Sequence, residues 1–209
     1  TMRNILFYVL TVLGGYLLGC SSMAYYVSRW KKVNLSTNGS GNLGASNTTI
    51  LLGWRMGILV ALHDIFKGAA AVLLAKWLLP DLTYAPVAAG CACVMGHMYP
   101  FYLKGKGGKG FASYMGMLLA LDWRLGLALI GVSLLVTFLS DYIVVGTLTT
   151  VVVGPVWIGF TQSWVSAGIM LAVTAVIFYK HRENLHRILH GGEVGLRSTL
   201  KGEHRLPKN

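Results

Sequence analysis

Acidic side chains are scarce in this sequence, which sets seven Asp and Glu residues against eighteen Lys and Arg. This balance gives a positive surface that attracts anionic partners, either lipid headgroups or anionic substrates. A sequence pI of about 9.8 would also suit nucleic acid, but the chain has no soluble basic domain to carry such binding. We therefore expect membrane lipids and small anions as partners, and no nucleic acid.

Cysteine is also scarce, and the three residues Cys20, Cys91 and Cys93 all lie inside apolar runs. An odd number of cysteines in apolar sequence argues against a disulfide framework. Cys91 and Cys93 lack the spacing and the partner residues of a zinc site. We predict that all three are small buried hydrophobic groups and that the chain holds no metal.

Several catalytic motifs are missing. The sequence has neither the Gly-x-Ser-x-Gly elbow of a serine hydrolase nor the His-Glu-x-x-His of a zinc enzyme. It has no Walker A motif, because Lys109 is followed by Gly110 and Leu103 stands where the first glycine of that motif should lie. These absences argue against serine hydrolase, zinc and P-loop nucleotide chemistry.

Charge of either sign is low, at 12% of the chain, whereas 55% is apolar and the mean hydropathy is +0.60. The apolar residues form long blocks, which indicates an all-α integral membrane protein. We expect one helical-bundle domain over residues 1–209 with about seven transmembrane helices, one of them short, and we interpret the first as a span rather than a signal peptide. The predicted spans cover residues 5–28, 57–79, 84–103, 111–121, 125–139, 142–160 and 164–179.

Seven crossings would place the two termini on opposite sides of the membrane, and positive charge marks the cytoplasmic side. Fourteen of the Lys and Arg residues fall on one predicted side and only Arg3, Lys76 and Arg124 on the other. We therefore predict an external N-terminus and a cytoplasmic tail over residues 181–209. The fourteen are Arg29, Lys31, Lys32, Arg55, Lys104, Lys106, Lys109, Lys180, Arg182, Arg187, Arg197, Lys201, Arg205 and Lys208.

Three polar, glycine-containing stretches fall on this cytoplasmic side, where they can converge. The first lies within residues 34–47, which are too rich in Gly, Asn and Ser to form a helix and are predicted to be a loop. The segment Ser-Gly-Asn-Leu-Gly-Ala-Ser-Asn at 40–47 offers hydroxyls, amides and N–H groups that suit an anion. A plain turn-rich connection is the alternative interpretation.

The second stretch, residues 96–110, combines glycines with three lysines. Glycine lets the backbone approach a bound group, and lysine supplies a point charge, so an anion site is expected. A flexible loop whose lysines only set the topology is the alternative. His97 beside these lysines is a candidate for catalysis or phosphate binding.

The third stretch, residues 180–193, begins as a helix and ends at two glycines. His181 and Asn184 share a face with apolar residues and should turn toward the bundle, whereas Glu183 can pair with Arg187 one turn later. Within the second predicted span, Asp64 and Lys67 are three residues apart, so each can offset the desolvation of the other.

Together these stretches resemble the three cytoplasmic motifs of the bacterial acyl-phosphate:glycerol-3-phosphate acyltransferase family, the PlsY family. Residues 40–47 are similar to its first motif, residues 96–110 to its second, and His181-x-x-Asn184 with Gly191-x-Glu193 to its third. The pattern Asp64-x-x-Lys67-Gly68 resembles the family as well. The resemblance covers essentially the whole chain and implies a bacterial inner-membrane enzyme with its active site on the cytoplasmic face.

The implied reaction moves a fatty acyl group from acyl phosphate to glycerol 3-phosphate, making lysophosphatidic acid and phosphate for phospholipid biosynthesis without a cofactor. An acyl phosphate is already activated, so positioning and charge stabilisation matter more than a strong nucleophile. The expected catalytic residues are Ser40, His97, His181 and Asn184. The expected substrate-binding residues are Gly41, Asn42, Gly44, Asn47, Lys104, Lys106, Gly107, Gly108, Lys109 and Glu193.

Four positions differ from the family pattern. Ile50 stands where the first motif has an Arg, Gly105 where an aromatic residue is usual, and Asp141 and Val144 where an Arg and a Ser precede the sixth span. These differences leave open a related enzyme with another acceptor. Asp64 and Lys67 within the membrane leave open an anion or lipid-phosphate transporter. Whether either histidine acts as a base, and the oligomeric state, stay open at the level of sequence.

Overall fold

The structure, a computed structural model, describes residues 2–200, without the side chains of residues 199 and 200. All the regular structure in this range is helical, which confirms the expected all-α class. Lys201, Arg205 and Lys208 lie outside the described residues. The elements are α1 (Met2–Cys20), α2 (Met23–Lys31), α3 (Ala45–Leu52), α4 (Trp54–Leu78), α5 (Ala85–Met98), the 3-10 helix η1 (Phe101–Leu103), α6 (Phe111–Leu121), α7 (Trp123–Ser140), α8 (Ile143–Thr161), α9 (Trp164–Leu189) and α10 (Leu196–Leu200).

Five helical stretches in the described chain are long and apolar enough to cross a membrane. They are α1 with α2, α4, α7, α8 and α9. Helices α5 and α6, with 14 and 11 residues, are shorter. The expected span 84–103 ends early, at Met98, because Pro100 disfavours helical backbone at Tyr99. The last helix runs ten residues past the expected span end at 179, which confirms that residues 180–193 begin as a helix that closes before the glycines.

Two further boundaries differ from the sequence prediction. The first span is broken at Ser21 and Ser22, where the Ser22 hydroxyl accepts a hydrogen bond from the main-chain N–H of Tyr25 and caps α2. The polar loop ends before Asn47, because Gly44 is extended and serves as the N-cap of α3. Both breaks use small residues whose backbone or side chain replaces helical hydrogen bonds.

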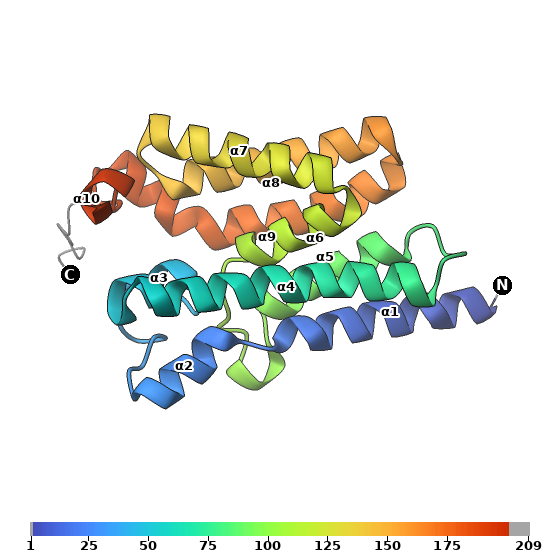
Figure 1. Cartoon of the computed structure of the whole chain (residues 1–209), viewed down its shortest axis with the longest axis horizontal. Helices are drawn as coiled ribbons and strands as arrows, with labels where there is room; N and C mark the ends of the chain where they lie inside the picture. Colours follow the sequence, from blue (N-terminus) through green and yellow to red (C-terminus); the bar gives the residue numbers. More distant parts are fainter. Residues whose placement is uncertain (1, 201–209) are drawn as a thin grey trace. The chain divides into compact units, whose positions relative to one another are not determined.

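The chain divides into two compact units, Thr1–Gly126 and Leu127–Asn209. In the first unit, α1 and α5 run parallel and in close contact, with Gly15 against Ala89 and Gly19 against Cys93 (Figure 1). A Cβ on either glycine would overlap a carbonyl oxygen of α5. Small residues at such contacts are typical of membrane helices, where close packing replaces the hydrophobic effect.

Helix α4 runs antiparallel to α5, and α6 returns in the direction of α4. The last turns of α4 and α6 lie together, where Lys76 Nζ donates to the carbonyls of Ala120 and Leu121. Gly68 packs on the backbone of Ser113, and Gly116 packs on the backbone of Ile65. Because α1 and α5 are parallel, the loop after α2 and the loop after α5 emerge at the same end of the unit. Two of the three polar stretches therefore lie together, as expected.

In the second unit, α7, α8 and α9 follow one another as antiparallel neighbours. The hydroxyl of Thr174 on α9 donates to the carbonyl of Val151 on α8 at 2.7 Å. Gly146 on α8 approaches Ser133 and Thr137 on α7. The third polar stretch continues from α9 and lies at the end of this unit that carries the α7–α8 turn.

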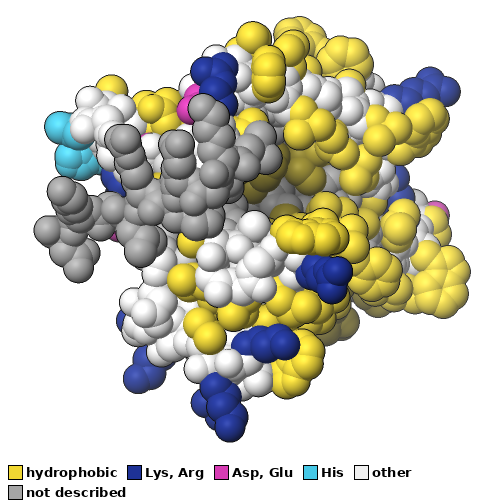
Figure 2. Space-filling model, turned by 60° about the vertical axis from the view of Figure 1, so that its left-hand side comes forward, with side chains coloured by type: hydrophobic (Ala, Val, Ile, Leu, Met, Phe, Trp, Pro, Cys, Tyr) yellow, Lys and Arg dark blue, Asp and Glu magenta, His cyan; other side chains and the backbone are white. Residues whose placement is uncertain are grey.

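Large hydrophobic side chains on the outside of the helices are widely exposed, including Phe66, Trp77, Leu134 and Phe160. Figure 2 shows several Lys and Arg side chains standing out from the surface. Hydrophobic side chains cover the flank beside them. This arrangement suits helices in lipid with a basic end at the headgroups.

Candidate active site

The loop that carries the first motif is organised by Asn47, whose side chain is completely buried. Its amide nitrogen lies 2.9 Å from the carbonyl oxygen of Leu35 and 3.1 Å from those of Asn38 and Asn42. Its amide oxygen accepts from the main-chain N–H of Ser40 at 2.9 Å. Asn47 therefore shapes the loop from within, whereas the side chain of Ser40 is exposed.

The loop that carries the second motif folds back on the end of α5. The N–H groups of Gly107 and Gly108 donate to the carbonyls of Met98 and His97, at 3.2 and 3.1 Å. A Cβ on Gly107 would overlap the carbonyl of His97, and one on Gly108 would overlap the ring at Nε2. Both positions require glycine because the loop backbone lies directly against His97.

The two loops meet at Gly108. The position of a Cβ on Gly108 lies 3.0 Å from the carbonyl oxygen of Leu43, in the first motif, as well as against His97.

Lys104 and Gly105 both have positive φ, 52° and 73°, which turns the chain sharply after η1. Glycine at 105, where the family usually has an aromatic residue, fits this left-handed backbone.

Behind the loops lies a buried polar cluster. The ammonium of Lys67 and the carboxylate of Asp64, each 2% exposed, are 2.8 Å apart, which confirms the expected pair. His97, 6% exposed, adds its Nδ1 at 2.9 Å from Lys67 Nζ and 3.3 Å from Asp64 Oδ1. His63 lies at the edge of the cluster, with Nδ1 3.5 Å from the same carboxylate oxygen. The cluster ties α4 to the end of α5.

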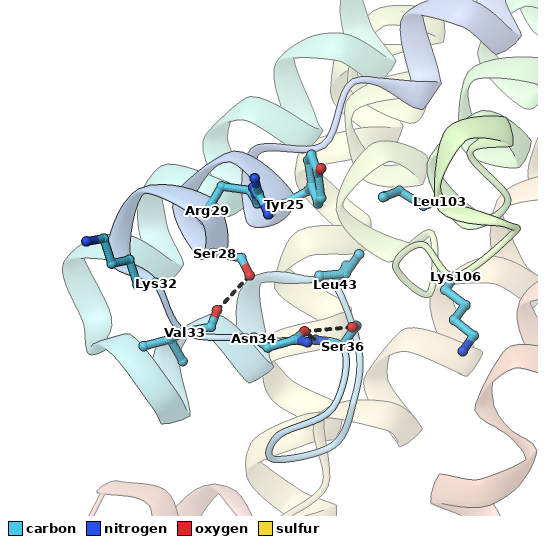
Figure 3. A pocket seen from close by; sticks show the side chains of 10 residues that line it. All are labelled: Tyr25, Ser28, Arg29, Lys32, Val33, Asn34, Ser36, Leu43, Leu103 and Lys106. Atoms are coloured by element: carbon cyan, nitrogen blue, oxygen red, sulfur yellow. Dashed lines mark hydrogen bonds between the residues drawn. The ribbon is translucent and has the colours of Figure 1, made fainter.

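A cavity of about 570 Å³ opens beside the first loop (Figure 3). The described residues that line it include three cations and no acid, so the cavity favours anions. Arg29 extends from α2, and Lys106 comes from the opposite wall (Figure 3). The lining residues are Tyr25, Ser28, Arg29, Lys32, Val33, Asn34, Ser36, Leu43, Leu103 and Lys106.

In the sequence, Arg29 and Lys32 indicate only the orientation in the membrane, and their place in the cavity was not predicted. A helical signal was present, because Tyr25, Ser28, Arg29 and Lys32 follow the spacing i, i+3, i+4, i+7 and so share one face. On the other side of the cavity, Tyr102 precedes the lining residue Leu103 and anchors it, because its hydroxyl donates to the carbonyl of Cys20 at 2.8 Å. Desolvation by burial is the main cause that raises the pKa of the Tyr102 phenol, so it stays protonated as a donor.

The third motif is closed by Glu193 in the second unit. One carboxylate oxygen of Glu193 accepts from the amide of Asn184, and the other accepts from Arg187 Nε at 2.7 Å. The expected pair between Glu183 and Arg187 is wrong, because Gly191 turns the chain back and brings Glu193 to Arg187 instead. Glu183 lies 3.6 Å from Arg182.

His181 is buried on the inner face of α9, as expected, and its Nδ1 donates to the carbonyl of Ile177 at 2.8 Å. That bond satisfies one ring nitrogen within the helix and fixes the orientation of the ring. Asn184 is half-buried on the next turn. Both residues therefore lie on the side of α9 that the sequence predicted.

The departures from the family pattern have local explanations. Asp141, with φ of 68°, accepts the main-chain N–H of Arg197 at 2.8 Å and so anchors the segment after the third motif. Ile50 lies on α3, and the nearest cation along the chain, Arg55, is exposed with its guanidinium 5.6 Å from the ring centroid of Trp54. Arg55 is not among the cavity residues and does not replace the missing Arg there.

Comparison with known proteins shows to which family the chain belongs. Residues 9–191 match the family model described as glycerol-3-phosphate acyltransferase. Glycerol-3-phosphate acyltransferase 1 of Oceanobacillus iheyensis is 38% identical over 203 residues, covering 93% of this chain and 98% of the relative. Glycerol-3-phosphate acyltransferase of Myxococcus xanthus is 38% identical over 179 residues, covering 85% and 93%.

Two solved structures are similar over nearly the whole chain. The crystal structure of the integral membrane glycerol 3-phosphate acyltransferase PlsY (YgiH) in its glycerol 3-phosphate form has a TM-score of 0.86 at 30% identity, covering 92% of this chain and 96% of that one. The lysophosphatidic acid form has a TM-score of 0.81, also at 30% identity, with coverage of 90% and 94%.

Proposed function

Because this chain belongs to the glycerol-3-phosphate acyltransferase family, we propose that it transfers a fatty acyl group from acyl phosphate to glycerol 3-phosphate. A hydroxyl oxygen of glycerol 3-phosphate forms a new bond to the acyl carbonyl carbon, and the bond from that carbon to the phosphate oxygen breaks. Lysophosphatidic acid and inorganic phosphate are the products, and the hydroxyl proton leaves to phosphate or solvent. No cofactor enters this balance.

One observation carries the proposal beyond family membership. The first two motifs meet at Gly108, directly beside His97, and the neighbouring cavity has three cations and no acid among its described lining residues. Both proposed substrates carry phosphate, so a basic cavity next to glycine-rich backbone suits them. We assign Lys106 and Arg29 to phosphate binding at this cavity, with Asn47 as the residue that holds the loop in shape.

The remaining assignments rest on the motifs. We propose that Lys104 and Lys109 add positive charge to the second loop and that Gly41, Asn42 and Gly44 form the backbone of the first. His97, His181, Asn184 and Ser40 would orient the acceptor hydroxyl or the acyl carbonyl. Glu193 contacts Asn184 and Arg187, so we assign it to positioning Asn184 rather than to direct contact with an anionic substrate.

We further propose that α5 and α6 also cross the membrane, giving seven crossings with the basic loops on the cytoplasmic face of a bacterial inner membrane. The alternating directions of α4, α5 and α6 along the chain support two additional crossings. The concentration of Lys and Arg after α2 and after α5 supports the orientation. Accessibility labelling of single cysteines at Lys104 and at Lys76 in sealed vesicles would test it, with opposite sides expected.

The test of the activity uses purified protein in lipid vesicles with acyl phosphate and glycerol 3-phosphate. We expect equal amounts of lysophosphatidic acid and released phosphate. Lys106→Gln should lower kcat/KM by about tenfold, because it removes a charge from the cavity. Lys31→Gln is the matched control, since Lys31 lies 4.0 Å over the Trp30 ring and outside the lining set.

The outcome separates the alternatives. Hydrolysis of acyl phosphate without acylation of glycerol 3-phosphate, together with acylation of another alcohol from a panel, would identify a different acceptor, for which Ile50 is the motivating residue. Absence of any acyl transfer would overturn the proposal. Substrate-dependent flux across the vesicle without a covalent product would indicate transport instead.

A further inference from the structure

The ammonium of Lys67 lies within hydrogen-bond distance of three polar atoms inside the first unit. Its Nζ is 2.7 Å from the carbonyl oxygen of Ser21, 2.8 Å from Asp64 Oδ1 and 2.9 Å from His97 Nδ1. A lysine ammonium has three N–H donors and no lone pair. Each donor therefore has one partner, and the three partners come from the break between α1 and α2, from α4 and from α5.

This count fixes the hydrogen positions on His97. The ammonium of Lys67 donates one N–H to the carboxylate of Asp64 and one to the carbonyl of Ser21, so its third N–H points to His97 Nδ1. Nδ1 must then offer its lone pair. In a neutral imidazole one nitrogen accepts and the other carries the proton, so the proton of His97 is on Nε2.

The alternative arrangement has His97 Nδ1 donating to Asp64. That contact is 3.3 Å, longer than the 2.9 Å contact with Lys67. A proton on Nδ1 would also point an N–H at a charged ammonium in a site where both side chains are almost fully buried. Two facing donors at that distance in a medium of low dielectric are strongly unfavourable.

Nε2 of His97 faces the place where the two motif loops meet. A Cβ at Gly108 would overlap this nitrogen, and the same position is 3.0 Å from the carbonyl oxygen of Leu43. A protonated Nε2 there offers a hydrogen bond toward oxygen atoms at the loop junction. A developing negative charge on a substrate oxygen is stabilised by a donor held in advance in this way.

We propose that Lys67 is a positioning residue that fixes His97 as the Nε2–H tautomer, so that His97 serves acyl transfer as a hydrogen-bond donor and not as the general base. This inference rests on the proposed function for the identity of the reaction. The tautomer itself is a property of the resting protein and is independent of the substrate.

The first experiment measures the tautomer directly. Full-length wild-type protein labelled with ¹⁵N-histidine is examined by NMR in lipid nanodiscs, and the signals of His97 are identified by their loss in His97→Gln. We expect Nδ1 to show the shift of an unprotonated ring nitrogen and Nε2 that of a protonated one. The reverse pattern overturns the inference even if the enzyme is fully active, whereas absence of acyl transfer with the expected pattern overturns only the proposed function.

A second experiment perturbs the donor. Lys67→Met removes the N–H that faces His97 and should shift the His97 signals toward the other tautomer, while lowering kcat by at least about tenfold with a smaller change in KM. Lys76→Met is the control on the same helix, because Lys76 Nζ donates to the carbonyls of Ala120 and Leu121 and not to the cluster. Unchanged His97 signals in folded Lys67→Met would contradict the assigned role.

A third comparison works at His97 itself, where the lysine is kept. The side-chain amide of His97→Gln can place an N–H near the position of Nε2, whereas that of His97→Asn reaches only the position of Nδ1. If donation from Nε2 is the role, His97→Gln retains about tenfold more kcat than His97→Asn. Equal kcat values, or a higher value for His97→Asn, would overturn the donor role.

Discussion

Arg187 and Glu193 form an ion pair at 2.7 Å across the turn that ends α9. The side chain of Glu193 is only 12% exposed, and its second oxygen holds the amide of Asn184. One carboxylate thus connects the last turn of α9 to the segment that follows it. We propose that Glu193 acts by fixing Asn184, a role in which an acidic residue is compatible with anionic substrates.

Glu193→Gln should release this connection. We expect kcat to fall by about tenfold, because Asn184 and Arg187 lose a charged acceptor. Glu183→Gln is the matched control, since Glu183 is exposed and 3.6 Å from Arg182. Steady-state kinetics of both variants would show the difference, and similar rates for the two would contradict the positioning role.

Asn47→Ala should disorganise the first motif. The change leaves the carbonyls of Leu35, Asn38 and Asn42 without their shared donor, and an unsatisfied buried polar group lowers stability by about 1–3 kcal/mol. We expect a lower Tm together with a rise in KM for glycerol 3-phosphate. Asn38→Ala serves as the comparison, because its exposed side chain donates to Asn34 and Thr37 on the surface of the loop. A Tm for Asn47→Ala no lower than for Asn38→Ala would speak against the loop as described.

Gly108→Ala should displace either the second loop or the ring of His97, because the added Cβ has no room beside Nε2. A displacement of about 1 Å near reacting groups can reduce the rate by about a hundredfold. Gly131→Ala adds the same methyl group on α7, where nothing lies within 4 Å. Retention of full activity by Gly108→Ala, measured in the same vesicles, would mean that the loop does not lie on His97 in the working enzyme.

Arg29→Gln should weaken the binding of a phosphorylated substrate at the cavity. We expect KM to rise by about tenfold, with a weaker dependence of KM on salt, since one charged contact is lost. Arg55→Gln is the control, because Arg55 is exposed beside Trp54 and outside the cavity lining. An equal rise in KM for both variants would show that Arg29 contributes only to the general positive charge of the surface and not to a specific binding site.

The sequence predicts the helices of this protein well where apolar runs are long, as in α4, α7 and α8. Helix boundaries are predicted less well where the end of a helix depends on a single side chain. The cap at Ser22 interrupts a run of residues without charge, so hydropathy alone cannot detect it. Asn47 looked like part of a polar loop because its place in α3 depends on hydrogen bonds to residues up to twelve positions earlier.

In the candidate site, too, some features follow from the local sequence and others do not. Motif glycines and lysines indicate an anion site, and the pair of Asp64 and Lys67 follows from helical spacing. The partners of Arg187 and of His97 could not be predicted, since the first depends on the turn at Gly191 and the second on packing between α4 and α5. Such contacts are set by tertiary structure rather than by local spacing.

The break between α1 and α2 has a consequence for the chemistry of the buried cluster. In a continuous helix the carbonyl of Ser21 would be bound by the N–H of Tyr25. Here the hydroxyl of Ser22 accepts that N–H, and the carbonyl of Ser21 accepts from Lys67 instead. The hydroxyl of Ser22 thus takes over the N–H of Tyr25 and leaves the carbonyl of Ser21 available to Lys67. The interruption of this membrane helix therefore provides a hydrogen-bond acceptor for a lysine nearly fifty residues further along the chain.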